Sequence, residues 1–379
     1  MDSRLSLIDL FAGAGGMTQG FMSTGRFRPV AAVEQDKAAA ATYALNHGQD
    51  HVFAGGIEDW LARGSVPAAD VIIGGPPCQG FSALGKQDVQ DARNFLWRQY
   101  AETIIRAKPK FFVLENVAQF RKSPQFGEFR QWTQPGGKLA NYELQDYLLN
   151  AADFGSFQNR KRTVVIGRRR DLPPVPDPEP THVGTQIKTV KSAFVQVSSQ
   201  VTKVDLPAGS YTAFGQRFPG PYTSAQLHVT RSYREISLKR FRDIPEGGNR
   251  FDIRTELLAD CWKKHKSGSG DVMGRLRWDK PSVTVRTEFF KPEKGRYLHP
   301  IEDRAITHFE AARLQGFPDD YKWVGSKTAI ARQIGNAVPI ELARYLGNLV
   351  AEQISALAVA QPGSQSDRHL NLLNVESLT

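Results

Sequence analysis

One cysteine of the chain stands in a sequence that favours chemistry. Cys78 follows the apolar run 71–73 in the segment GGPPCQG, residues 74–80. Two prolines stiffen a turn at the end of a predicted strand, so we expect the thiol to be presented to a ligand. A thiol in this setting is a candidate nucleophile, although packing as a small apolar side chain is the commoner fate of a free cysteine. The second cysteine, Cys261, is expected to be structural.

An acid and two arginines are the candidate partners of this thiol. Glu115 ends the apolar run 111–114, where a sheltered carboxyl can hold or donate a proton, with a solvated strand-end acid as the alternative. Arg160 and Arg162 lead into the apolar run 163–166, and their guanidinium groups suit bidentate contacts to carbonyl or carboxylate oxygens. Because ligands of open α/β sheets bind beyond strand ends, we expect these groups to lie near a ligand.

A glycine-rich turn follows the first apolar run of the chain. The segment DLFAGAGG places Gly13, Gly15 and Gly16 directly after residues 5–10, and Glu34 comes 21 residues after Gly13. In doubly wound folds an acid at about this distance binds ribose hydroxyls. The glycine spacing differs from the diphosphate-binding pattern G-x-G-x-x-G, so a nucleoside without phosphates, such as S-adenosylmethionine, fits better than a dinucleotide.

The elements that must position these residues alternate along the first 170 residues. Strands are predicted at 5–10, 30–33, 71–73, 111–114 and 163–166, with helices at 36–46 and 94–107 between them. Apolar strands separated by helices predict an α/β fold with a doubly wound, mostly parallel, Rossmann-like sheet. Near the C-terminus, a helix from His308 should stop at Gly316 and Pro318, and residues 333–339 should form a turn ahead of the final helix.

Changes in amino-acid composition divide the chain into segments. The proline-rich stretch that begins at Asp171 cannot continue a sheet or a helix and marks a boundary. We therefore expect residues 1–172 to form a first segment and residues 173–300 an inserted, smaller one. Residues 301–360 become helical again, and 361–379 should form a disordered tail.

Charge and composition limit the function classes. The chain has 379 residues and a formal net charge of +10, and residues 171–300 hold 21 Lys and Arg against 14 Asp and Glu, which favours a polyanionic partner. Basic side chains that could follow phosphates include Arg231, Arg234, Lys239, Arg240 and Arg242. Two cysteines without Cys/His clusters argue against a disulfide framework or a metal site. Neither a signal peptide nor a membrane-spanning run is recognisable, so we expect a cytoplasmic protein.

These motifs, in this order, resemble the DNA (cytosine-5) methyltransferases of the bacterial restriction-modification type. The resemblance spans nearly the whole chain apart from the tail. It is carried by residues 9–21, 76–79, 115–117, 158–162, 310–318 and 335–338.

The resemblance implies transfer of a methyl group from S-adenosylmethionine to carbon 5 of a flipped cytosine in double-stranded DNA. Cys78 would add to carbon 6 of the base, Glu115 would bind or protonate N3, and Arg160 and Arg162 would be the supporting cations. The cofactor contacts it implies are Phe11, Gly13, Gly15, Gly16, Glu34, Ile57, Pro76, Leu96, Asn336 and Val338. By the same resemblance, residues 1–172 and 301–360 would form the catalytic, cofactor-binding domain and residues 173–300 the DNA-recognition domain. It also implies a monomer without a metal, and leaves open the recognised sequence and whether a restriction endonuclease shares it.

Two departures from the family pattern concern the cofactor site. Gly56 stands where many members have an acid facing adenine, and Glu58 or Asp59 could substitute. Asn94 stands where glycine is frequent. Neither departure touches the four catalytic candidates.

Four other functions share parts of this pattern. A tRNA cytosine-5 methyltransferase would share the chemistry but is expected to lack an insert of about 120 residues. A non-catalytic DNA-binding regulator would not need the complete set of reactive residues. A dinucleotide oxidoreductase is disfavoured by the glycine spacing, and an amino-methyltransferase by the absence of Asp/Asn-Pro-Pro-aromatic.

Overall fold

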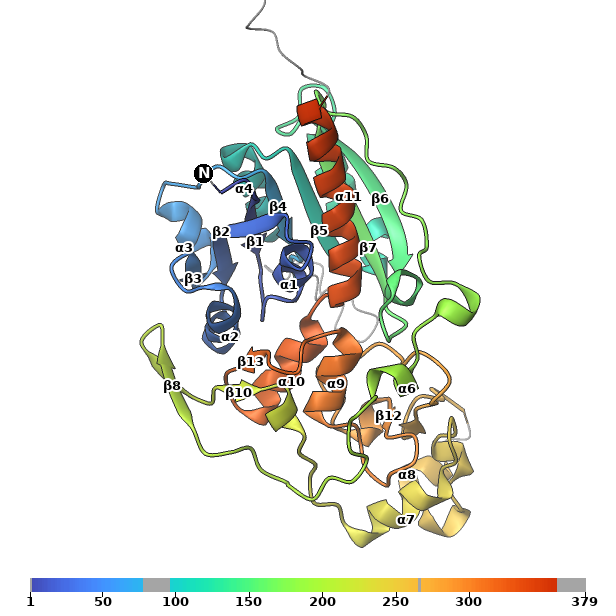
Figure 1. Cartoon of the computed structure of the whole chain (residues 1–379). Coiled ribbons are helices and arrows are strands. Elements are labelled where there is room, and N and C mark those ends of the chain that lie inside the picture. The colour runs from blue at the N-terminus through green and yellow to red at the C-terminus, as the bar shows by residue number, and fades with distance from the viewer. Residues whose placement is uncertain (1, 78–95, 265–266, 360–379) are drawn as a thin grey trace, which may run out of the picture.

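A seven-stranded sheet forms the centre of the larger half of the molecule (Figure 1). The computed structural model describes residues 2–77, 96–264 and 267–359. Its strand order is β3-β2-β1-β4-β5-β7-β6. The strands are β1 (Leu5–Leu10), β2 (Phe27–Glu34), β3 (Val52–Ala54), β4 (Val71–Gly74), β5 (Phe111–Val117), β6 (Tyr142–Asn150) and β7 (Lys161–Arg169).

The predicted α/β class with a mostly parallel sheet is confirmed. β1 pairs in parallel with β2 and β4, β2 with β3, and β4 with β5. β7 instead pairs antiparallel with both β5 and β6. The short connection from β6 to β7 dictates this reversal, because a parallel pair would need a long crossover.

Helices cover both faces of this sheet. They are α1 (Gly16–Met22), α2 (Lys37–His47), α3 (Ile57–Ala62), α4 (Leu96–Ala107), α5 (Pro124–Trp132) and α11 (Ile340–Val359). The predicted helix 36–46 corresponds to α2, whose N-terminus is capped by Asp36 through bonds from the N–H groups of Ala38 and Ala39. Residues 94–95 of the predicted helix 94–107 lie outside the described residues, and the rest forms α4.

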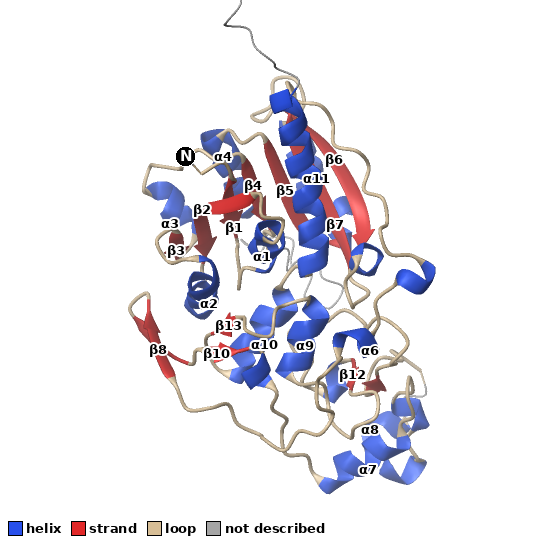
Figure 2. Cartoon of the chain, in the orientation of Figure 1, coloured by secondary structure: helices blue, strands red, loops and turns tan. Residues whose placement is uncertain are grey.

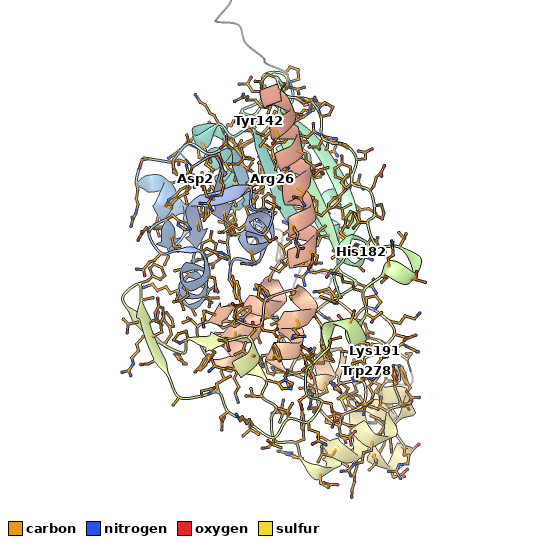
Figure 3. All side chains as sticks on the ribbon, in the orientation of Figure 1. Asp2, Arg26, Tyr142, His182, Lys191 and Trp278 are labelled. Carbon is orange, nitrogen blue, oxygen red and sulfur yellow. The ribbon has the colours of Figure 1, made fainter. Side chains whose placement is uncertain are left out.

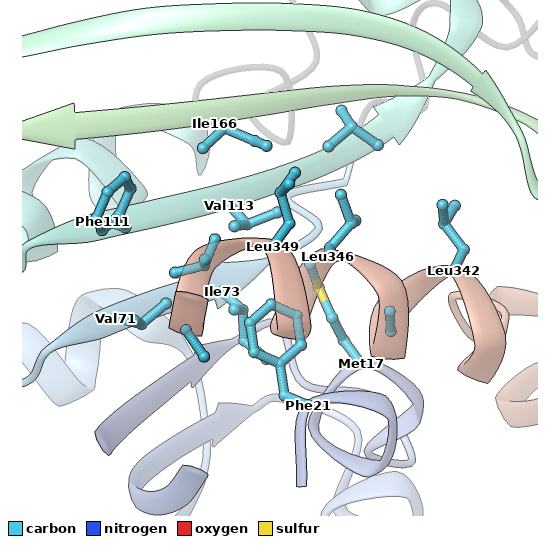
Figure 4. Close-up of a cluster of buried hydrophobic side chains, with 14 of the residues drawn as sticks. Met17, Phe21, Val71, Ile73, Phe111, Val113, Ile166, Leu342, Leu346 and Leu349 are labelled. Carbon is cyan, nitrogen blue, oxygen red and sulfur yellow. The ribbon is translucent and has the colours of Figure 1, made fainter. Parts of the chain in front are cut away.

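The two faces bury separate cores. On one face, α1 and α11 pack on alternate residues of the strands, including Leu7, Ile73 and Val113 (Figure 4). On the other face, α3, α4 and α5 cover Ile8, Ile72 and neighbouring apolar residues. The final helix therefore returns from the C-terminal end of the chain to the N-terminal half of the sheet.

Most of the chain between β7 and α11 builds the smaller half of the molecule (Figure 2). It contains the antiparallel pair β8 (Ser210–Ala213) and β9 (Gln216–Pro219) and two-residue to three-residue strands β10 (Tyr222–Thr223), β11 (Gly274–Arg275), β12 (Arg296–Leu298) and β13 (Lys322–Trp323). Its helices are α6 (Val190–Ala193), α7 (Glu235–Asp243), α8 (Asp260–Lys263), α9 (His308–Gln315) and α10 (Lys327–Asn336). Backbone hydrogen bonds connect distant parts of this half. For example, the N–H of Lys191 donates to the carbonyl of Trp278 (Figure 3).

The return segment divides its packing between the two halves. α9 and α10 share a core with Val190, Leu227 and Val285 of the middle segment. Further along the same segment, Val338 and α11 pack in the core of the large sheet. Among the described residues, no helix is both long and apolar enough to cross a lipid bilayer.

Candidate active site

A cavity of about 600 Å³ lies at the carboxyl ends of β1, β2, β4 and β5. That size suits a nucleoside-sized ligand. The described wall includes nine of the ten residues predicted to contact the cofactor: Phe11, Gly13, Gly16, Glu34, Ile57, Pro76, Leu96, Asn336 and Val338. It also includes three of the four catalytic candidates: Glu115, Arg160 and Arg162. The sheet thus brings together residues from both ends of the chain.

The glycine turn after β1 forms one wall of the cavity. Phe11, Gly13 and Gly15 have φ angles of 57°, 56° and 87°, so the chain makes a left-handed turn that favours glycine. A Cβ on Gly13 would meet no atom within 4 Å, which leaves open space beside its backbone. Gly15 is not part of the wall; a Cβ there would come within 2.5 Å of Nε2 of His47, so this glycine is needed for packing behind the turn.

Glu34, at the end of β2, is fixed beside this turn. Its Oε2 accepts a hydrogen bond of 2.8 Å from the N–H of Gly13, and its Oε1 accepts one of 2.7 Å from the N–H of Asp36. Burial raises the pKa of Glu34 above its ordinary value. Each oxygen keeps a further lone pair, so the carboxylate can still accept bonds from ligand hydroxyls.

The start of α3 forms another part of the wall. Ile57 is buried there and Glu58 follows it along the wall, whereas Asp59 is not part of the wall. Of the two acids that could replace the missing acid at Gly56, the geometry therefore favours Glu58.

Glu115 and Arg162 form an ion pair inside the cavity. Nε of Arg162 lies 2.8 Å from Oε1 of Glu115, and both side chains are largely buried. The antiparallel register of β5 and β7 produces this pair, because it sets Val117 opposite Arg162 and Glu115 opposite Val164. A Cβ on Gly75 would lie 3.3 Å from Oε2 of Glu115, so the glycine leaves room for the carboxyl.

Arg160 is placed differently from Arg162. Its Nη1 donates to the carbonyl of Val285 at 2.9 Å and its Nη2 to that of Gly335 at 3.0 Å. Burial, aided by the nearby charge of Arg162, lowers the pKa of Arg160 to about 9, so it remains a cation at neutral pH. Its fork is thus occupied by the backbone of the middle and return segments, which suits a residue that positions the cavity wall.

The proline turn after β4 is held by Asn116. Nδ2 of this buried residue donates to the carbonyl of Pro76 at 2.9 Å. Pro76 and Pro77 both belong to the cavity wall. Cys78, the predicted nucleophile, lies outside the described residues and directly follows Pro77 in the sequence.

A family model described as C-5 cytosine-specific DNA methylase matches residues 5–352. The chain belongs to this family. It is therefore a DNA methyltransferase, as the sequence motifs predicted.

Curated relatives match this methyltransferase over most of its length. Type II methyltransferase M1.HphI of Haemophilus parahaemolyticus is 33% identical over 356 residues, which cover 91% of this chain and 86% of that protein. Type II methyltransferase M.Sau96I of Staphylococcus aureus is 31% identical over 360 residues, covering 92% and 76%. DNA (cytosine-5)-methyltransferase 1B of Oryza sativa is 28% identical, covering 94% of this chain but 29% of that protein.

Solved structures share the fold of the methyltransferase. A DNA modification methyltransferase encoded within a prophage of E. coli superimposes with a TM-score of 0.69 at 24% identity, covering 93% of this chain and 99% of that one. The S. pombe Dnmt2 methyltransferase gives a TM-score of 0.54 at 18% identity, with 93% and 100% covered.

Two features of the methyltransferase's cavity were missed by sequence analysis. Asp9 belongs to the wall and is only 1% exposed; it accepts a hydrogen bond of 2.6 Å from Thr18, and burial raises its pKa to about 7. Behind the opposite wall, Gln158 bonds to Gln315 at 2.8 Å and accepts from the N–H of Val285. Asp9 could have been noticed as an acid inside a predicted strand. The contact between Gln158 and Gln315 has no local signal in the sequence, because the two residues are 157 positions apart.

The charges of the wall are unevenly distributed. Four carboxyl groups lie around the glycine turn: Asp9, Glu34, Asp36 and Glu58. The cations Arg160 and Arg162 lie instead beside Glu115, and Arg332 lies 3.8 Å from Asp36. No cluster of His, Cys, Asp and Glu suited to a metal ion occurs in the part of the chain that the structure describes.

Proposed function

We propose that this methyltransferase transfers a methyl group from S-adenosylmethionine to carbon 5 of cytosine in double-stranded DNA, through a covalent bond between Cys78 and carbon 6 of the base. The observation that carries the proposal is one cavity that joins an acid-lined glycine turn to the Glu115–Arg162 ion pair and the proline turn before Cys78. Its two ends suit a cofactor and a polar base respectively.

The charge of the glycine-turn end supports the choice of cofactor. Carboxyl groups surround the turn, which disfavours a diphosphate and favours a ligand with a positive charge. When bound, S-adenosylmethionine supplies a methyl group activated by its cationic sulfur. Glu34 would hold the ribose hydroxyls, Ile57 would pack beside adenine, and Glu58 would face its amino group.

The other end of the cavity supports the proposed chemistry of the base. Carbon 5 of cytosine is a weak nucleophile, but addition of the Cys78 thiolate to carbon 6 moves an electron pair to carbon 5. Glu115 would bind or protonate N3 and so draw electrons away from carbon 6. Arg162 would keep Glu115 oriented and polarise the O2 oxygen of the base. After transfer, a base takes the proton from carbon 5, the released electron pair re-forms the double bond between carbons 5 and 6, and the thiolate leaves carbon 6.

The target must leave the double helix to enter this cavity. Extrusion of a base costs a few kcal/mol, which contacts to the opened strand can offset. We propose that residues 173–300, which carry most of the net positive charge, form the DNA-recognition domain and that residues 1–172 and 301–360 form the catalytic domain. We further propose that the protein acts as a monomer on chromosomal DNA in a bacterial cytoplasm.

One experiment tests the proposed function directly. The full-length protein is incubated with methyl-labelled S-adenosylmethionine and either duplex DNA or tRNA, and the digested nucleosides are separated. We expect label in 5-methylcytosine from DNA alone. Label confined to tRNA, or present on an exocyclic nitrogen, would reject the proposal. Methylation-sensitive sequencing of the product then gives the recognised site.

A further inference from the structure

The carbonyl of Ala14, in the glycine turn, is bonded from behind by a residue distant in sequence. The hydroxyl of Tyr321 donates to this carbonyl, although the two residues are 307 positions apart. Tyr321 follows α9 in the return segment and is only 3% exposed. The Tyr321 hydroxyl has one proton, which it donates to Ala14. In its second hydrogen bond, of 3.0 Å, the hydroxyl oxygen must therefore accept the proton carried by Nε2 of His47.

His47 also supports the turn by packing. Its ring carries the proton on Nε2 to make this bond, and burial lowers its pKa to about 4, so the ring is neutral at physiological pH. The ring fills the space in which a Cβ of Gly15 would lie. Tyr43 packs against His47 with ring centroids 4.8 Å apart, and its hydroxyl lies 3.1 Å from that of Thr18, which binds Asp9.

The surroundings hold Tyr321 in place. Asn46 of α2 exchanges two hydrogen bonds with the backbone of Lys322, of 2.8 and 2.9 Å. Thr42, one turn earlier, accepts a bond of 2.9 Å from the N–H of Val324. Through these side chains α2 pairs with the backbone of β13 much as a strand would, and Tyr321 lies immediately before this attachment.

We propose that Tyr321 and His47 are positioning residues that set the conformation of the Ala14–Gly15 turn and thereby the affinity of the cavity for the cofactor. This inference rests on the proposed function, because it assigns a determinant of cofactor binding at that site. Neither residue belongs to the described wall of the cavity, so they act through the turn. Loss of the Tyr321 hydroxyl leaves the Ala14 carbonyl buried without its donor and frees the turn to move.

The test measures cofactor binding separately from catalysis. S-adenosylhomocysteine is titrated into the full-length protein by calorimetry, and initial rates give KM for cofactor and for DNA. For Tyr321→Phe we expect Kd and cofactor KM to rise about tenfold, as for loss of about 1.4 kcal/mol. The kcat at saturating cofactor and the KM for DNA should stay close to their wild-type values.

A matched control separates positioning from a general loss of stability. Tyr142 is also a buried tyrosine whose hydroxyl donates to a backbone carbonyl, that of Pro109, at 2.8 Å. It lies at the end of the sheet remote from α9 and α10 (Figure 3). Tyr142→Phe should lower Tm as Tyr321→Phe does but leave Kd unchanged. Equal Kd values for wild type, Tyr142→Phe and Tyr321→Phe overturn the inference.

A second pair of variants tests the role of His47. His47→Gln can still donate to the Tyr321 hydroxyl and should keep a Kd near that of wild type, whereas His47→Leu cannot and should weaken binding. In a double-mutant cycle, the effects of His47→Leu and Tyr321→Phe on Kd should be non-additive, because both variants break the hydrogen-bonded chain from His47 through Tyr321 to Ala14. Full additivity contradicts this chain. Should Tyr321→Phe fail to fold, the Kd values of His47→Gln and His47→Leu test the inference on their own. Wild-type protein that binds no S-adenosylhomocysteine would instead reject the proposed function.

Discussion

The carboxyl group of Glu115 is the proposed acid that binds or protonates N3 of the base. Arg162 lies 2.8 Å from one of its oxygens, while the other oxygen lies near the Gly75 backbone of the proline turn. An amide at this position keeps the shape of the side chain but removes its charge and its capacity to transfer a proton.

We expect Glu115→Gln to lower kcat for methyl transfer by about 10² to 10⁴, the usual contribution of a general acid. Binding of S-adenosylhomocysteine should be unchanged, because the carboxyl lies at the base end of the cavity. Single-turnover rates with labelled cofactor measure the effect. Glu128→Gln, which alters an exposed acid paired with Arg98, is the control and should react at the wild-type rate. A fully active Glu115→Gln enzyme would contradict the proposed role.

Asp9 makes the stability of the protein depend on pH. Its pKa is about 7 in the folded protein and close to 3.8 in the unfolded chain, so between pH 4 and 7 the folded state binds the extra proton. Stability from this group is therefore lost as pH rises through that window. Asp9→Asn keeps an acceptor for Thr18 but cannot titrate.

Urea denaturation of wild type and Asp9→Asn at pH 5 and pH 8 measures this dependence. We expect the variant to gain stability relative to wild type on going from pH 5 to pH 8. Glu34, whose pKa burial also raises, is present in both proteins, so its contribution largely cancels. Identical pH profiles for the two proteins would show that Asp9 does not titrate as inferred.

At the scale of elements, α9 depends on a buried ion pair at its start. Both oxygens of Glu310 accept bonds from Arg304, of 2.7 and 2.8 Å, and Thr307 completes a capping box with Glu310. Burial alone would raise the pKa of Glu310, but these bonds outweigh it and hold the pKa below its ordinary value.

We expect Glu310→Ala to lower the free energy of unfolding by about 3–5 kcal/mol, because it leaves the buried Arg304 charge without its carboxylate partner. Glu102→Ala breaks an exposed i,i+4 pair with Arg106 and should cost less than about 1 kcal/mol. Urea denaturation at pH 7 compares the two variants. Similar losses for both would show that the buried pair does not hold α9 in place.

Elements with strong local signals could be predicted from the sequence. The five predicted strands and the helix 36–46 follow mainly apolar runs or an Ala-rich stretch with a capping Asp36. β3 is an apolar stretch of only three residues, and β6, at the edge of the sheet, mixes polar and apolar residues, so both carry weak local signals. The antiparallel direction of β7 depends on pairing with β6 and was missed for the same reason.

The candidate site was predictable in so far as its residues follow strand ends. Arg160 and Arg162 are two positions apart in one motif, yet only the paired strands show that one binds backbone carbonyls and the other Glu115. The support of Gly15 by His47 and Tyr321 joins α2 to the return segment. No local pattern reveals such a contact.

At the scale of the whole molecule, the structure divides the basic residues of the middle segment into two classes. Arg275 is 4% exposed and bonds to the carbonyls of Ile244 and His299, and Arg242 pairs with Glu235 and Asp303. Arg240 bonds to the carbonyl of Leu257, and Arg231 lies over the ring of Tyr233. In contrast, Arg234 and Lys239 are exposed and have no side-chain partner among the described residues.

We therefore expect Arg234 and Lys239 to bind phosphates. Each of Arg234→Ala and Lys239→Ala should weaken DNA binding and reduce the slope of log K against log salt concentration by about one. Fluorescence anisotropy with duplex DNA over a range of KCl concentrations measures both quantities. Arg275→Ala should lower Tm instead, because it removes internal hydrogen bonds. An unchanged slope in both surface variants would exclude these two residues from the DNA contacts.

The cavity wall takes residues from the segment 9–17 on one side and from the segment 332–338 on the other. During translation its first wall therefore leaves the ribosome more than three hundred residues before its last. A nascent chain therefore completes the wall of this cavity only after residues 332–338 have been made, so termination before residue 332 yields a product that lacks one side of the site.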